Sequence, residues 1–179
     1  KFLDGKRVDI VDKHQNEIAG YVDFRQMLFS WMTFNAGFRV DNHDQAGTEC
    51  IPQAGLAFHL PKDAELKLSA SRGFRYPIIR EMFMWGVANA DLEAESIWNY
   101  ELAFSQKLMD NQLKYGVNVF HLRGDNMIVV APVNGKMMNV NTGEIENTGV
   151  EFQVDYRLSP MVSLNGNYSY LHMENPVIG

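Results

Sequence analysis

The sequence predicts an all-β fold, an antiparallel up-and-down meander of about eight strands. Apolar and polar residues alternate along most of the 179-residue chain, which is the period of a strand with one apolar face. Short and long connections between the predicted strands also alternate along the chain. No segment has a convincing helical period, although 77–85 could form a helical turn.

Four predicted strands, 16–28, 31–43, 53–60 and 65–73, precede the longest connection. The segment 31–43 shows the pattern most clearly, because apolar even positions oppose mainly polar odd positions: Met32, Phe34, Ala36, Phe38 and Val40 against Thr33, Asn35, Arg39, Asp41 and His43. A slip of one residue would exchange the two faces, so the pattern also fixes the pairing register.

Four further strands are predicted at 98–107, 114–119, 149–158 and 162–170. Segments rich in Pro, Asp, Asn and Ser predict tight turns near 28–31, 59–65, 107–114 and 157–163. Between them lie a modest connection over 41–50, a very long loop over 73–96 and another long loop over 123–148. Within the last, 134–136 is expected at a loop tip, and 147–149 as a turn into a strand. We therefore expect the tight turns at one end of the sheet and the loops at the other.

This alternation is compatible with a membrane barrel or with a soluble β domain. The barrel is favoured because short turns at one end and long loops at the other are typical of outer-membrane barrels. Several predicted strands also approach the roughly 9–11 residues that a tilted strand needs to cross a bilayer. Aromatic residues lie toward both ends of the apolar face, as interfacial girdles do: Phe58, Phe104 and Tyr156 near tight turns, and Trp98, Tyr100 and Tyr170 near loops.

Composition excludes several other classes of protein. A net charge of −6 argues against a nucleic-acid partner, and the single cysteine, Cys50, excludes an internal disulfide or a multi-cysteine zinc site. No window approaches the eighteen or so consecutive apolar residues of a membrane-spanning helix. Because the chain starts at Lys1 rather than at a methionine, we expect a piece of a longer protein.

No arrangement of reactive side chains predicts an enzyme, a cofactor or a resident metal. The five histidines are scattered without metal-ligand spacing, and the paired carboxylates Glu93 and Glu95 have no nucleophile nearby. Methionines gather in and beside the predicted loops: Met82, Met84, Met127, Met137, Met138 and Met173. They would suit a copper-binding receptor or, as the blander alternative, adaptable apolar contacts.

Several phrases, taken in order, resemble the C-terminal part of a TonB-dependent outer-membrane receptor. They are "ASRGFRYPIIREMF" from Ala70, "NADLEAESIWNYELAF" from Asn89, "NVNTGEIENTGVEF" from Asn139 and "LNGNYSYL" from Leu164. The resemblance implies that 1–179 is part of a 22-stranded transmembrane barrel in the bacterial outer membrane, without its plug domain and remaining strands. It also implies import of a scarce nutrient, such as a ferric siderophore or other metal complex, with energy from the TonB complex.

The resemblance places the 73–96 loop outside the cell, where it can meet a small nutrient ligand. Arg75, Arg80, Phe83 and Trp85 are its candidate ligand contacts, although Arg75 and Glu81 could simply tie the loop to the wall. Two alternatives remain beside this interpretation. The chain could be a soluble adhesin or carbohydrate-binding β domain, or its eight strands could close a small barrel by themselves. An open sheet would need the remaining strands, or another chain, to pair its edges.

Overall fold

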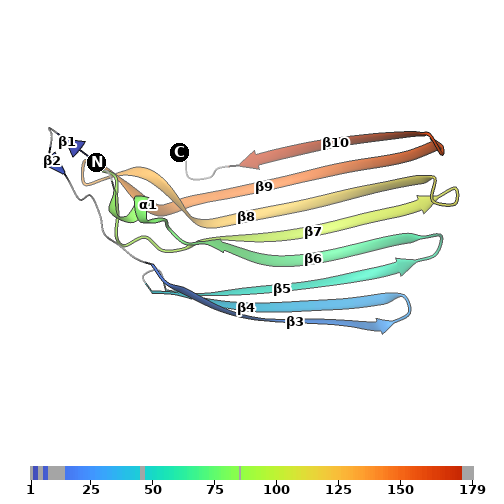
Figure 1. The fold of residues 1–179 in the computed structure, drawn as a ribbon, viewed down its shortest axis with the longest axis horizontal. Coiled ribbons are helices and arrows are strands. Elements are labelled where there is room, and N and C mark those ends of the chain that lie inside the picture. Colours follow the sequence, from blue (N-terminus) through green and yellow to red (C-terminus); the bar gives the residue numbers. More distant parts are fainter. Residues whose placement is uncertain (1, 4–5, 8–14, 45–46, 85, 175–179) are drawn as a thin grey trace.

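Eight long strands form one antiparallel sheet in the computed structural model, which describes residues 2–3, 6–7, 15–44, 47–84 and 86–174 (Figure 1). The strands lie side by side in chain order: β3 (Glu17–Phe29), β4 (Met32–His43), β5 (Gly47–Leu60), β6 (Ala64–Arg75), β7 (Glu95–Leu108), β8 (Leu113–Val133), β9 (Lys136–Ser159) and β10 (Val162–Glu174). The helix α1 (Ile79–Phe83) lies between β6 and β7, and β1 (Phe2–Leu3) pairs with β2 (Lys6–Arg7) in a separate small sheet. The predicted meander is thereby confirmed.

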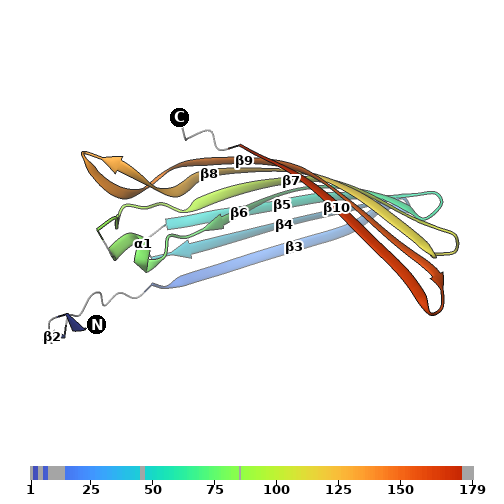
Figure 2. The ribbon, with the colours of Figure 1, turned by 90° about the horizontal axis from the view of Figure 1, so that it is seen from above.

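The eight-stranded sheet is open. Its order runs from β10 at one edge to β3 at the other, and these two edge strands do not pair with each other. The alternative of a small closed barrel is therefore wrong for this sheet. Figure 2, seen from above, shows the strands curving together as a single layer.

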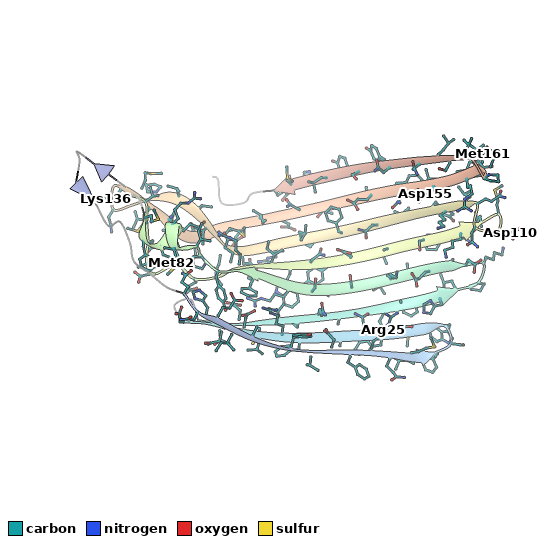
Figure 3. The ribbon with its side chains drawn as sticks, viewed as in Figure 1. Arg25, Met82, Asp110, Lys136, Asp155 and Met161 are labelled. Atoms are coloured by element: carbon teal, nitrogen blue, oxygen red, sulfur yellow. The ribbon has the colours of Figure 1, made fainter. Side chains whose placement is uncertain are left out.

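The two ends of the sheet differ as the sequence predicts. At the turn end, connections of two to four residues join β3 to β4, β5 to β6, β7 to β8 and β9 to β10. The opposite end, called the loop end here, carries the 76–94 connection with α1 and the tip of the β8–β9 hairpin. Figure 3 places Met82 and Lys136 at the loop end, and Asp110 and Met161 at the turn end.

Alternate side chains give the sheet one apolar and one polar face. The register pairs apolar with apolar residues across strands, as in the rows Leu56↔Leu68↔Leu102↔Val119↔Val150↔Tyr170. On the other face, polar residues are partners, such as Asn118↔Glu151↔Ser169. A one-residue slip would put polar-face side chains such as Glu101 and Glu151 among the apolar ones, which is why alternation determines the register.

The apolar face has no second layer over it in the described part of the chain. Large apolar side chains remain exposed along it, including Ile18 at 79% and Tyr168 at 64%. The buried apolar residues among those described are Ala64, Pro77, Met82, Leu92 and Ala94, and only Ala64 belongs to the sheet. A soluble sandwich buries such a face against a second sheet. This sheet instead presents it outward, as the wall of a membrane barrel does.

Aromatic rings mark both borders of the apolar face. Near the turn end, Trp31 stacks on Phe29 and on Phe58, with ring centroids 5.3 and 6.1 Å apart. Toward the loop end, Trp98 stacks on Tyr100 at 6.0 Å. At that second border the same face becomes polar, because His121, the cross-strand partner of Tyr100, forms one row with Thr148 and His172. Among the described residues, no helix combines the length and the apolar character needed to cross a membrane.

Two predicted connections are wrong in extent. The predicted long loop over 123–148 is mostly strand, because β8 and β9 continue past the other strands and meet at a two-residue turn, Asn134–Gly135. Both turn residues have positive φ, 51° and 78°, as a type I′ hairpin turn requires, so the loop tip expected at 134–136 is confirmed as a tight hairpin. The turn expected at 147–149 lies inside β9. The connection over 41–50 shrinks to 44–46, since β4 and β5 both extend into it.

Candidate functional site at the loop end

The β6–β7 loop, residues 76–94, is a compact unit with a small core of its own. Pro77, Met82, Leu92 and Ala94 are all buried, and Met82 and Leu92 are each only 3% exposed. Its helical turn, α1, begins after Ile78, whose backbone N–H donates to the Glu81 carboxylate at 3.0 Å. A surface loop that buries apolar side chains in this way holds one shape rather than many.

Arg75, the last residue of β6, joins the loop to the sheet. Its two terminal nitrogens donate to the two carboxylate oxygens of Glu81 at 3.0 and 3.2 Å, while its Nε donates to Glu95 at the start of β7. The other oxygen of Glu95 accepts the backbone N–H of Ile128, in β8, at 2.8 Å. The Glu95 side chain is only 8% exposed, so both of its oxygens are satisfied away from water.

These contacts set the protonation of Glu81. Partial burial opposes its ionisation, but the hydrogen bonds from Arg75 and from the Ile78 N–H outweigh that effect and hold the pKa of Glu81 below its ordinary value of 4.5. Glu81 is therefore an anion at neutral pH, and the fork-to-fork pair with Arg75 is fully charged.

Tyr76 fixes the first residue of the loop against β4 and β5. Its hydroxyl lies 3.3 Å from the carbonyl oxygens of Asp41 and Gly47, and can donate to either. Its ring packs on His43 and Phe74, with centroids 4.5 and 4.8 Å away. Burial, followed by the nearby Asp41 carboxylate, raises the pKa of Tyr76, so the hydroxyl keeps its proton and remains a donor.

Two asparagines of β9 hold the far side of the loop. The Asn139 side chain donates to the carbonyl oxygen of Glu81 at 3.0 Å. The Asn141 side chain accepts the N–H of Glu93 at 2.8 Å and donates to the carbonyl oxygen of Glu93 at 3.0 Å. The loop is thus fastened on one side to β6 and β7 and on the other side to β9.

The predicted ligand contacts have different surroundings. Arg80 is exposed on α1, and Phe83, at the end of the same helix, is half-buried. Arg75 is engaged with Glu81 and Glu95, so the ion pair that could tie the loop to the wall is present. Trp85 lies outside the described residues. The roles of Glu95, Asn139 and Asn141 were not predicted from the sequence. For the two asparagines, the one available signal was the Asn134–Gly135 pair, which indicates a hairpin turn just before them.

The polar face carries a broad hollow over β3 to β7. A cavity of about 560 Å³ lies there, and its charged and amide lining residues are Asp23, Arg25, Asn35, Gln53, Lys67 and Glu101. Gln53 donates to Asp23 at 3.0 Å across the intervening strand. This face suits contact with water or with a polar partner, in contrast to the opposite face.

No group of three or more His, Cys, Asp or Glu side chains in the described part of the chain could hold a metal ion. Met82 is packed in the core of the loop, which matches the apolar alternative for that residue. The copper alternative for the other methionines stays a prediction.

Comparisons with known proteins agree with this architecture. The family model described as "TonB dependent receptor-like, beta-barrel" matches residues 6–178. The iron-regulated outer membrane virulence protein of Vibrio cholerae is 25% identical over 96% of this chain and 31% of its own length. The metal-pseudopaline receptor CntO of Pseudomonas aeruginosa is 24% identical over 84% of this chain and 20% of its own. The chain thus spans less than a third of these relatives.

Solved structures show the same fold. The siderophore receptor PirA of P. aeruginosa superimposes with a TM-score of 0.79 over 89% of this chain and 32% of that chain, at 21% identity. The ferric enterobactin receptor PfeA also gives 0.79, over 88% of this chain and 27% of that chain, at 18% identity. None of these matches supports the soluble adhesin or carbohydrate-binding alternative. The chain belongs to the TonB-dependent receptor-like β-barrel family, and its sheet is part of the wall of an outer-membrane barrel.

Proposed function

We propose that the chain is part of a receptor that imports a scarce nutrient across the outer membrane, with a ferric siderophore or another metal complex as its cargo. The observation that carries this proposal is the single-layer sheet with an outward apolar face, a polar face and one elaborated loop end. The printed names of the relatives, an iron-regulated protein and a metal-pseudopaline receptor, support metal chelates as the class of cargo.

The complete barrel on this proposal has 22 strands, of which 1–179 supplies part, and encloses a plug domain. The polar face with its 560 Å³ hollow then borders the plug and the water-filled interior. The outward face contacts lipid, and TonB provides energy through the plug. The protein transports rather than catalyses, takes no cofactor and binds no nucleic acid.

Within the loop, Arg80, Phe83 and Trp85 are the proposed ligand contacts, and Arg75 positions the segment that bears them. Arg80 is exposed at the surface of α1, where a cation attracts an anionic metal chelate. Phe83 adds an apolar ring on the same helix, so one face of the loop offers both charge and contact area.

Uptake by cells tests the proposal directly. A strain lacking the gene, and the same strain carrying it, would be supplied with radioactive iron as ferric enterobactin or as other iron chelates, and separately with copper, haem, cobalamin and oligosaccharides. We expect gene-dependent uptake of at least one iron chelate, abolished when TonB is removed. Uptake that does not depend on the gene for any of these solutes would contradict the proposal.

The matched variants are Arg80→Gln in the loop and Arg123→Gln, which removes an exposed cation from the outward face of β8. An exposed charge contact is worth about 1 kcal/mol or less, so Arg80→Gln should raise KM for the chelate by about three- to fivefold. Arg123→Gln should leave KM unchanged. Equal KM values for both variants would exclude Arg80 as a ligand contact while leaving the transport proposal intact.

A further inference from the structure

We infer that Asn139 and Asn141 are positioning residues that fasten the β6–β7 loop to the β8–β9 extension, the part of that hairpin (126–145) beyond the neighbouring strands. The two external segments then move as one body, and the loop does not open as a separate flap. The structural part of this inference is independent of any ligand. Its consequence, that the loop presents Arg80 and Phe83 in a fixed place, rests on the proposed function.

The free edge of β9 is the first point of attachment. Among the described residues, β10 pairs with β9 only as far as Glu146, so the segment of β9 from Lys136 to Ile145 has an edge that no strand covers. The loop takes its place, because the Asn139 N–H donates to Val87 O at 2.7 Å and Asn139 O accepts the Asn89 side chain at 2.9 Å. An uncovered edge is a template for unwanted pairing, and the loop removes it here.

The Asn139 side chain also binds the β6–β7 loop, in addition to the Asn139 backbone. It reaches Glu81 O at 3.0 Å, and the residue as a whole is only 7% exposed. A buried amide that lost this acceptor would bear the cost of desolvation without compensation, so the loop and the strand stabilise each other. Glu81 also accepts from Arg75, which joins the clamp to the sheet.

Asn141 forms the second clamp. Its side-chain amide both accepts from and donates to the backbone of Glu93, as a neighbouring strand would, and it also donates to Asn126 O at 2.9 Å. Asn126 has a positive φ of 57° and lies where the β8–β9 ladder is irregular, between Gly124 and Ile128. Such a bulge bends a strand, and here it aims the hairpin toward the loop.

Glu95, at the start of β7, links the bulged part of β8 to Arg75 in β6. Ile128, just past the bulge, donates its N–H to Glu95, which also accepts from Arg75. Opening the loop as a flap from β9 would break five hydrogen bonds to Asn139 and Asn141. A flap that opens readily has few such contacts, so the geometry favours one rigid body.

Hydrogen exchange followed by mass spectrometry tests this inference on the full gene product in outer-membrane vesicles, with no ligand added. The variant Asn139→Asp/Asn141→Asp keeps the shape of both side chains but removes their N–H donors. We expect the amides of 78–94 to exchange at least tenfold faster in this variant, while those of β7 exchange at the original rate.

The matched control is Asn167→Asp, which makes the same chemical change on exposed β10 and should exchange like the original protein. Should the double variant not assemble, each single variant is measured instead, with at least threefold faster loop exchange expected. Unchanged loop exchange would overturn the inference. Equal acceleration in the loop and in β7 would also overturn it, because the asparagines would then support the whole sheet rather than the loop. Uptake measurements do not enter this test, so its failure is separate from failure of the proposed function.

Discussion

At the residue scale, Arg75 organises the loop end because one guanidinium serves two carboxylates. Glu81 belongs to the loop and Glu95 to the wall, so a single side chain fixes their relative position. Lysine could not replace it, since an ammonium group lacks the planar fork that engages Glu81 through two nitrogens while Nε serves Glu95.

Protonation of Glu81 at low pH should destabilise the β6–β7 loop. Its pKa is lower in the folded loop than the ordinary 4.5, so its contribution to stability is complete above pH 4.5 and is lost as the pH falls through the folded pKa. Loop exchange rates, corrected for the intrinsic pH dependence of exchange, should therefore rise relative to β7 below about pH 4.5. In Glu81→Gln this additional acid sensitivity should vanish. Equal acid sensitivity in the variant and the original protein would show that another group is responsible.

Gly149 leaves room for the ring of Phe120 on the polar face. A Cβ added at Gly149 would lie 2.4 Å from Phe120 Cζ, so Gly149→Val should destabilise the barrel by about 1–3 kcal/mol. The measurement is the free energy of unfolding by urea in lipid vesicles. Gly20→Val is the matched control, since no atom of the described residues lies within 4 Å of a Cβ there. Adding Phe120→Ala to Gly149→Val should recover part of the loss; no recovery would contradict this explanation.

At the element scale, each strand has two faces whose surroundings differ sharply over one residue. Leu68 on β6 pairs with Leu56 and Leu102, whereas its neighbour Ser69 pairs with Gly55 and Glu101. The first side chain meets lipid and the second meets the polar interior, although both are equally part of the same strand.

Arginine at these two positions should therefore destabilise the protein to different extents. Leu68→Arg should cost about 2–4 kcal/mol of unfolding free energy in lipid vesicles, because a guanidinium near the bilayer midplane is poorly solvated. Ser69→Arg should cost less than about 1 kcal/mol, since the new cation faces the interior beside Glu101. Similar losses for both variants would mean that the faces are wrongly assigned.

Alternation predicted the strands where lipid and water lie on opposite sides, and it was least informative where they do not. The segment from Ile128 to Val133 is apolar on both faces and contains Pro132, so it lacks the period of a wall strand. It lies in the β8–β9 extension beyond the apolar band, where the requirement for alternation ends. The clamps by Asn139 and Asn141 could not be predicted, because they join segments 58 and 48 residues apart in the chain, respectively.

At the scale of the whole molecule, the open sheet depends on strands beyond its two edges. The N–H and C=O groups on the outer sides of β3 and β10 have no partner strand within the described sheet. In hydrocarbon such groups cost several kcal/mol each, so one layer with two open edges is not a stable membrane structure.

Residues 15–174 expressed alone should therefore fail to insert as a monomer. In lipid vesicles we expect this fragment to form oligomers or aggregates. Its strands should be digested by added protease. The gene product in outer membranes should resist the same protease and remain folded. A protease-resistant monomeric fragment, measured by light scattering in detergent, would contradict this expectation.

The unequal ends of the sheet also decide where the protein has room to evolve. An insertion of one residue into a two-residue turn such as 160–161 would disturb the pairing of the strands on either side, and with it the entire wall. An insertion in the 76–94 segment or at the hairpin tip, Asn134–Gly135, would leave the pairing of the wall strands intact, because both project beyond the band that meets the bilayer. Insertions and substitutions in these two segments can therefore accumulate while the paired strands of the wall stay unaltered.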